Sequence, residues 1–316
     1  MAIGEQIAAH MEEGIGQRCC LQIGGLSLGF TPYKMGIQLD PDHESFKIAS
    51  SACEVEVDLE WVRQLSPIRS KKLFDSGAVW SLYEGGDEFI FDFNTPVLGS
   101  NPYKRLYIDK NFSYGQMLLV RGCYANEAHV HALEYPVDEL IVTNWLARGR
   151  GVEVHGCGIT DDAQNSYLFV GHSGAGKSTT TKLWQEQGNV RILSDDRIII
   201  RKNILRENRE NKDNHQFSMY GTPWHGEAGF ASPEKAPLKQ IFVLEHGERN
   251  EIVPLAQSAA AAELFARCFL PFHDPQALAA TLAYLDELTR TVPCYKFQFL
   301  PDQTAVEKIL EFQHSR

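Results

Sequence analysis

The stretch VGHSGAGKSTTTKLW, residues 170–184, constrains this chain more than any other. It fits the pattern G-x-x-x-x-G-K-[ST], with Gly171, Gly176, Lys177 and Ser178 at the fixed positions. The apolar run YLFVG at its start predicts a buried strand, and KSTTTKLWQEQ after the glycines predicts a helix. A strand, a glycine-rich turn and a helix in this order form the framework of a phosphate-binding loop.

The pattern assigns a chemical task to each part of this loop. Glycines let backbone N–H groups curl around phosphate oxygens, and the positive end of the following helix attracts an anion. We expect Lys177 to reach the β and γ phosphates and Ser178 to hold Mg²⁺. The residues expected to bind the nucleotide are Gly171, Ser173, Gly174, Ala175, Gly176, Lys177, Ser178 and Thr179. The alternative is a turn that matches by chance, on the order of one in a hundred at a glycine frequency of about 7%.

Composition and charge narrow the classes of partner. A chain of 316 residues is long enough for two domains, and its hydrophobic content of 43% is typical of a soluble protein. The net charge of −11, with PIRSKK as the one basic cluster, argues against a nucleic-acid partner. The acidic N-terminal stretch does not resemble an export signal, and no apolar run reaches the length of a bilayer span. We therefore expect a cytoplasmic protein with no nucleic-acid or membrane partner.

Cysteine and histidine spacing does not favour a metal site made of these residues. The seven cysteines are scattered and form no C-x-x-C pair, which indicates reduced thiols and no zinc site. The run HVH, His129 to His131, could place two imidazoles on one side of a strand, but it lacks a third ligand at useful spacing. A surface feature is the favoured interpretation.

The first part of the chain, residues 1–130, has the pattern of a β-rich N-terminal domain of unknown role. Its short strand-like runs, FKIAS among them, are separated by turn residues. The segment WSLYEGGDEFIFDF predicts a hairpin with Gly85 and Gly86 at the turn. We expect an antiparallel β module, with a sandwich as one arrangement.

The second part, residues 131–316, alternates predicted strands and helices, which is typical of an α/β layer architecture with a mixed central sheet. The predicted strands are YLFVG, VRILS, RIIIR, IFVLE and CYKFQF, and the predicted helices cover 177–187, 256–268, 275–288 and 304–312, with a further helix in VDELIVTNWLARGRG. The polar run at 202–216 predicts an exposed hairpin tip or a mobile loop.

A pair of carboxylates, Asp195 and Asp196, follows the predicted strand VRILS, 18 residues after Lys177. The strand that follows the loop helix should end beside the nucleotide. One carboxylate can hold Mg²⁺ opposite Ser178, and the other can accept a proton from an attacking hydroxyl. A plain turn is the alternative, since Asp is common in turns, but nearness to a phosphate site favours the functional interpretation.

A P-loop followed this closely by an Asp pair resembles the group of HPr kinase/phosphorylase and ATP-dependent phosphoenolpyruvate carboxykinase. Upstream, RGRGVEVHGCGI resembles the segment that places a histidine before the P-loop in HPr kinases, and His155 stands at the matching position. The resemblance covers about residues 135–300. It implies an α/β P-loop kinase domain after the β-rich domain. It also implies His155 beside the phosphates or beside the proton-accepting Asp; a hydrogen-bonded core histidine is the alternative.

The same resemblance implies roles for the other matching residues. Lys177 would contact the nucleotide phosphates, and Asp195 would act as general base. Ser178 and Asp196 would hold Mg²⁺, although the roles of the two aspartates could be exchanged. The implied catalytic residues are therefore Asp195, His155 and Lys177, and the implied cofactors are ATP and Mg²⁺.

The chain departs from HPr kinases after the Asp pair. Where those proteins have a glutamate and an Arg-Gly signature strand, this chain has MYGTPWHGEAGFASPEKAPL. We place Glu227 near a second metal position, with Ser178 and Asp196, and Arg267 as a phosphate or transition-state contact. Trp224 and His225 could form a substrate wall or a packed corner. These departures indicate the looser set of HPr-kinase-like proteins, some of which phosphorylate serine in peptides.

Three functions follow from this pattern. The first is an ATP-dependent kinase that transfers the γ-phosphate to a hydroxyl acceptor, a peptide serine or a small metabolite. The second is a small-molecule, carboxykinase-like enzyme, for which we do not find the expected basic and metal-binding residues. The third is a nucleotide-binding regulatory or scaffold protein, which would not need a general base. The oligomeric HPr kinases suggest that a homo-oligomer is also to be expected.

Overall fold

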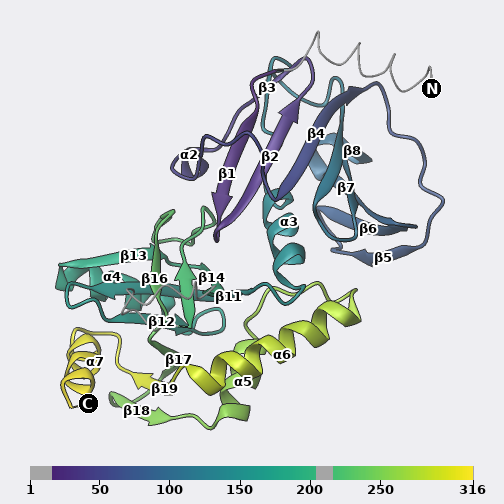
Figure 1. Ribbon diagram of the computed structural model, residues 1–316. Helices are drawn as coiled ribbons and strands as arrows, with labels where there is room; N and C mark the ends of the chain where they lie inside the picture. The colour runs from purple at the N-terminus through teal and green to yellow at the C-terminus, as the bar shows by residue number, and fades with distance from the viewer. Residues whose placement is uncertain (1–15, 204–215, 316) are drawn as a thin grey trace. The chain divides into compact units, whose positions relative to one another are not determined.

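The computed structural model describes residues 16–203 and 216–315, and it is mixed α/β (Figure 1). The chain divides into two compact units, 1–22 with 26–141 and 23–25 with 142–316. The division falls inside helix α3 (Val137–Leu146), and we describe each unit by itself. The acidic N-terminal stretch and nearly all of the polar run at 202–216 lie outside the described residues.

The first unit is built on an eight-stranded sheet. Its order is β1 (Cys19–Ile23), β2 (Leu26–Pro32), β4 (Val55–Val62), β9 (Tyr114–Val120), β8 (Gly99–Asp109), β7 (Glu88–Thr95), β6 (Trp80–Gly85) and β5 (Lys72–Asp75). A second, two-stranded pair joins β3 (Gly36–Ile37) and β10 (His129–Val130), and the short helices are α2 (Pro41–Glu44) and η2 (Pro96–Leu98).

The prediction of an antiparallel module was right for β5 to β9, which pair antiparallel in sequence, and wrong for β4. Strand β4 pairs in parallel with both β2 and β9, and the described strands form one continuous sheet rather than two facing ones. The long connection between β2 and β4 allows the chain to return in the same direction. Alternation of apolar residues marks a strand but does not identify its partner, which is why the sequence missed this.

Two local predictions in this unit were also wrong. The run FKIAS is not a strand; it follows α2, and within it only Lys47 makes a bridge, to Leu21. In the β6–β7 hairpin the turn lies at Gly86 and Asp87, one residue later than predicted, because Gly85 still pairs with Glu88. Gly86 has a φ of 74°, which glycine adopts without strain.

The second unit is built on a mixed sheet, as the alternation of strands and helices predicted. Its order is β16 (Lys235–Pro237), β15 (Phe217–Tyr220), β14 (Arg197–Lys202), β11 (Val152–Asp161), β12 (Ser166–Val170), β17 (Gln240–His246), β19 (Cys294–Phe299) and β18 (Glu251–Pro254), and β13 (Val190–Ser194) pairs with β11. The three strands β12, β17 and β19 are mutually parallel, and the other pairings are antiparallel.

Helices cover both faces of this sheet. The helices are α4 (Lys177–Gln187), α5 (Gln257–Phe265), α6 (Pro275–Thr291) and α7 (Thr304–His314), close to the predicted ranges. Side chains alternate along each strand, so Leu168 and Val170 of β12 pack in one core with α5 and α6. Tyr167 and Phe169 pack in the other core, with α4 and α7. Figure 1 shows α5 and α6 side by side and α7 at the C-terminal end.

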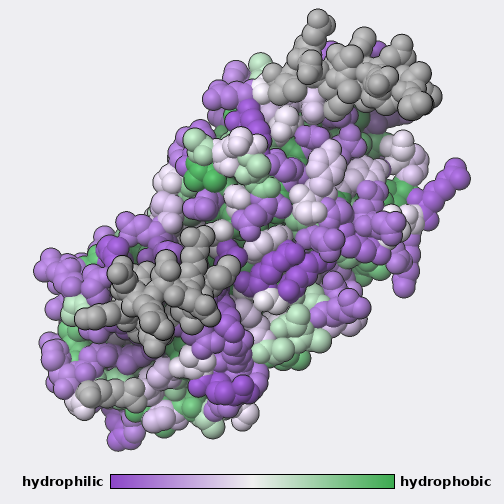
Figure 2. Space-filling view, in the orientation of Figure 1, coloured by the Kyte–Doolittle hydropathy of each residue, from purple (hydrophilic) through white to green (hydrophobic). Residues whose placement is uncertain are grey.

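The surface is mainly polar in the view drawn. Hydrophilic residues cover most of this face, and apolar residues appear in small groups (Figure 2). Exposed apolar side chains include Val97, Tyr135 and Phe272. Within the part of the chain that the structure describes, no helix is long and apolar enough to cross a membrane.

Candidate functional site

The predicted strand, glycine-rich loop and helix are confirmed as β12, residues 171–176 and α4. Gly174 and Gly176 have φ of 79° and 97°, conformations that side chains with a Cβ rarely adopt. His172, Ser173 and Gly174 at the apex are exposed, so backbone groups there are open to a ligand. Helix α4 ends at Gln187 and is followed by Gly188, as predicted, because glycine is a common residue at the end of a helix.

The loop lies at the carboxyl ends of the parallel strands. His246 and Phe299, the last residues of β17 and β19, stack on each other with ring centroids 5.7 Å apart. His246 Nε2 is 2.8 Å from the carbonyl oxygen of Gly174, and a Cβ on Gly176 would lie 2.4 Å from Phe299 Cζ. This edge of a parallel sheet is where α/β proteins bind ligands.

Lys177 is buried and crosses the loop. Its Nζ donates hydrogen bonds to the carbonyl oxygens of Gly171 and His172, both at 3.1 Å. Burial, with a smaller effect from the charge of Arg267, lowers the pKa of Lys177 to about 8. A cation held this way ties the two ends of the loop together and carries its charge towards the loop's concave side.

The site forms where β11 changes partners, at His155 and Gly156. On one edge of β11, Gly156 is the last residue to pair with β12, opposite Val170, just before the P-loop. The next residue back, His155, donates its backbone N–H to the carbonyl oxygen of Arg267 at 2.8 Å. On this edge, β11 is therefore bonded to β12 from Gly156 onwards and to the segment around Arg267 before it. The change of partner lies beside Val170, where the chain leaves β12 and enters the P-loop.

The other edge of β11 changes partners at the same level. There β13 pairs with Gly158 to Asp161, β14 pairs with Val152 to His155, and the Asp195-Asp196 turn lies between the two strands. The backbone N–H of Gly156 donates to the carbonyl oxygen of Asp196 at 2.9 Å. A single strand thus holds the P-loop on one side and the Asp pair on the other.

His155 and Asp196 contact each other directly: Nε2 lies 2.9 Å from Oδ1. Burial, followed by the positive charges of Lys177, Arg197 and Arg267, lowers the pKa of His155 to about 4. The imidazole is therefore neutral near pH 7, and it must carry its proton on Nε2 to donate to Asp196.

Arg197 is a member of this cluster that the sequence did not indicate. Its guanidinium pairs with Asp196 and lies 3.6 Å from Glu153 Oε1. It also stacks 4.5 Å from the ring centroid of Phe269, which lies edge-on to His155. The position directly after the Asp pair is the one signal that could have identified it.

Asp195 occupies a different environment from its neighbour. It is 1% exposed, and its carboxylate accepts hydrogen bonds from the backbone N–H groups of Gly226, Ala228 and Phe230, at 3.1, 2.9 and 3.1 Å. Both oxygens point at the segment that follows the Asp pair in sequence, GTPWHGEAGF, and not at His155. The two adjacent aspartates thus face opposite ways.

The remaining predicted residues are spread around this centre. Ser178 and Thr179 lie half-buried in the first turn of α4, and Glu227 is exposed beside Gly226. Arg267 pairs with Glu263, while its Nε is buried and has no hydrogen-bond partner among the described residues. Among the residues that the structure places, no three His, Cys, Asp or Glu side chains are grouped to hold a metal ion.

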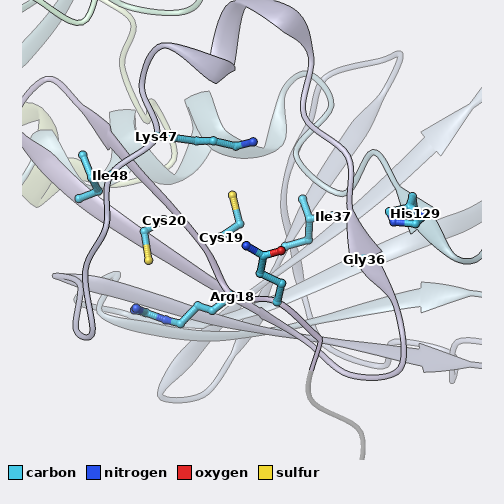
Figure 3. Close-up of a pocket in the computed structure, with 9 residues that line it drawn as sticks. Arg18, Cys19, Cys20, Gly36, Ile37, Lys47, Ile48 and His129 are labelled. Carbon is cyan, nitrogen blue, oxygen red and sulfur yellow. The ribbon is translucent and has the colours of Figure 1, made fainter.

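A cavity of about 390 Å³ lies in the first unit (Figure 3), and His129 of the HVH run is one of the residues that line it. Its walls include Arg18, Cys19, Cys20, Lys47 and His129. The two sulfur atoms point to opposite sides, as consecutive strand residues do. Two of its cations are already paired: Arg18 with Glu56 and Lys47 with Glu44.

No protein-family model matches this chain, and a search of curated proteins found no significant match.

Proposed function

We propose that this protein is an ATP-dependent phosphotransferase that moves the γ-phosphate to a hydroxyl acceptor. One observation carries the proposal: the 2.9 Å contact between His155 and Asp196 lies next to Gly156, which pairs with Val170, the residue before the P-loop. A protein that only bound nucleotide would need the loop but not a carboxylate oriented by a histidine. The resemblance to HPr kinases points to the same chemistry.

In this proposal the phosphates lie against the backbone N–H groups of residues 171–176 and the N-terminus of α4. Lys177 disperses the charge that develops on the transferred group, and Arg267 lies close enough for its charge to act on both Lys177 and His155. The acceptor oxygen attacks the γ-phosphorus, the bond from that phosphorus to the β–γ bridging oxygen breaks, and ADP leaves.

We assign the proton-accepting role to Asp196. The sequence left the roles of the two aspartates open, and the contacts favour Asp196 as the proton acceptor. Asp196 is half-buried and is held by two side chains, His155 and Arg197, whereas Asp195 is 1% exposed and already accepts three backbone hydrogen bonds. The hydroxyl proton passes to Asp196, and the neutral His155 keeps the carboxylate aimed at the site.

We propose Mg²⁺ as the metal. The donors offered are oxygens, the hydroxyl of Ser178 and the exposed carboxylate of Glu227, and Mg²⁺ prefers oxygen ligands shared with substrate phosphates. Ser178 would hold the ion from the first turn of α4, with Glu227 as the second candidate. The ion would neutralise charge on the phosphate oxygens.

The acceptor is a hydroxyl-bearing molecule, a peptide serine or a small metabolite. Purified protein with γ-labelled ATP and Mg²⁺ should transfer label to one member of a panel of hydroxyl metabolites and serine peptides. The matched variants are Asp196→Asn, which should lose transfer, and Asp161→Asn, which should keep it. Asp161 holds Asn165 and Tyr167 at the β11–β12 turn, away from the loop. Tight MgATP binding without transfer to any acceptor would instead support a regulatory nucleotide-binding protein.

A further inference from the structure

The carboxylate of Asp195 holds a loop in place. Its three backbone donors, Gly226, Ala228 and Phe230, are alternate residues of the segment that follows β15. Their N–H groups converge on the two oxygens of one side chain that is 1% exposed. A buried carboxylate satisfied by three donors is a strong anchor, because breaking those hydrogen bonds would leave a charge buried without partners.

The same loop is also bonded, at both of its ends, to the strands on either side of the Asp pair, β13 and β14. At its start, Thr222 Oγ1 donates to the carbonyl oxygen of Arg197 at 2.8 Å. At its end, Ala231 forms a backbone bridge with Ser194. Asp195 holds the stretch between these two points. Residues 222–230, which we call the anchored loop, are therefore fixed to the β13–β14 turn along their length.

The anchored loop runs directly against Asp196. A Cβ on Gly226 would lie 2.9 Å from Asp195 Oδ2 and 3.3 Å from Asp196 Cβ. Glycine at this position lets the backbone approach both aspartates. The half-buried Trp224 and the exposed His225 precede it. His155 lies at Oδ1 of Asp196 and Arg197 at Oδ2, so the carboxylate is bordered by these two side chains and by the loop.

We propose that Asp195 is a positioning residue. It holds the anchored loop in the place where the loop forms the acceptor-binding side of the site, with Trp224 and His225 contacting the acceptor. The inference rests on the proposed phosphotransfer, and it goes further by giving Asp195 a role other than proton transfer. Its oxygens are already used by the loop, so it could take a proton only by giving up hydrogen bonds. The acceptor would present a hydroxyl to Asp196 beside an aromatic and an imidazole side chain.

The test compares Asp195→Asn, Asp195→Ala and Gly226→Ala with wild type, and uses Asp161→Asn as the control, since it also removes a carboxylate that holds a turn, at a half-buried position. Three quantities are measured: amide hydrogen exchange of residues 222–230, affinity for ADP without Mg²⁺, and the rate of phosphate release from MgATP to water. Asparagine keeps one oxygen acceptor for the loop but cannot accept a proton; alanine keeps neither.

Positioning predicts a graded series. Loop exchange should rise by about tenfold or more in Asp195→Ala and less in Asp195→Asn, because local opening is limited by the hydrogen bonds lost. Phosphate release should fall in the same order, and Gly226→Ala should resemble Asp195→Asn although its carboxylate is intact. Affinity for ADP without Mg²⁺ should stay within about threefold of wild type, since the proposed phosphate contacts come from residues 171–179 and not from the anchored loop.

Two results would overturn the inference. Equal and complete loss of phosphate release in Asp195→Asn and Asp195→Ala, with loop exchange unchanged, would make Asp195 the proton acceptor. Unchanged exchange and unchanged rates in all three variants would show that the loop is not held by this side chain. If wild type neither binds nor turns over nucleotide, the proposed function fails, while the exchange series still reports whether Asp195 anchors the loop.

Discussion

His155 Nε2 and Asp196 Oδ1 lie 2.9 Å apart, and the two residues come from elements on either side of the P-loop in sequence. Strand β11 brings them together because it pairs with β14 at His155 and with β12 at Gly156. The contact therefore depends on the pairing of β11 with both β12 and β14. The pKa of His155 provides a way to test it.

The first prediction concerns stability and pH. The pKa of His155 is lowered from 6.5 to about 4 in the folded chain, chiefly by burial. The unfolded chain then binds this proton more tightly, so His155 makes stability fall as pH drops from about 6.5 towards about 4. His155→Gln should lose less unfolding free energy between about pH 7 and about pH 5 than wild type does, measured by urea unfolding. An equal loss in both proteins would contradict it.

The second prediction concerns the effect of a polyanion on the same group. Lys177, Arg197 and Arg267 contribute to the low pKa of His155, so an anion that neutralises them should raise it towards 6.5. Titrating the imidazole by NMR with and without saturating tripolyphosphate would measure this shift. The resonances of the exposed His314, at the end of α7, should not move and serve as control. If the pKa of His155 did not change, the anion would bind elsewhere.

The third prediction concerns Lys177, whose Nζ bonds two carbonyl oxygens of the loop. Lys177→Met keeps the length of the side chain but removes its charge. Affinity for MgATP should fall about 10- to 100-fold, since hydrogen bonds to a charged group contribute roughly 1.5–3 kcal/mol. Calorimetry gives the affinity, and Lys182→Met, an exposed change on the same helix, should bind as wild type does. Undiminished binding by Lys177→Met would remove the loop from the nucleotide site.

The fourth prediction concerns the close packing of Gly176. An added Cβ would meet Phe299 Cζ at 2.4 Å and would also require a φ of 97°. Gly176→Ala should therefore cost more stability than Gly188→Ala, which has a φ of 73° but open space around it. We expect a difference of about 1–3 kcal/mol in unfolding free energy, the usual cost of overpacking. Phe299→Ala should reduce that difference in a double-mutant cycle; a cycle with no coupling would argue against the contact.

The fifth prediction concerns the thiols. All seven cysteines are free, and burial raises the pKa of Cys157, Cys268 and Cys294 to about 12. The thiolate is the reactive form. Without reductant, denatured protein should therefore show seven reactive thiols, and in the folded protein at about pH 8 these three should label much more slowly than the partly exposed Cys123. Fewer than seven in denaturant would indicate a disulfide.

Short-range patterns were enough to predict the helices and five strands of the second unit, but β11, β15, β16 and β18 were not predicted. The strand before the loop, helix α4 with its stop at Gly188, and the strands on either side of the Asp pair lie where the sequence indicated. Each depends on residues close together in the chain: apolar alternation for a strand, and glycine where the backbone must turn. The parallel pairings of β4 escaped prediction because partner choice depends on distant segments.

The sequence by itself determined that this chain carries a glycine-rich loop of the pattern G-x-x-x-x-G-K-[ST], a nearby pair of carboxylates and a histidine upstream, because residue type and local spacing can be read from it directly. Only the tertiary structure decided what each carboxylate faces. Asp195 turns to the N–H groups of Gly226, Ala228 and Phe230, and Asp196 turns to His155. Adjacent residues were separated in this way because the chain bends at the pair, between β13 and β14, and the groups that lie on each side of that bend are fixed by long-range packing.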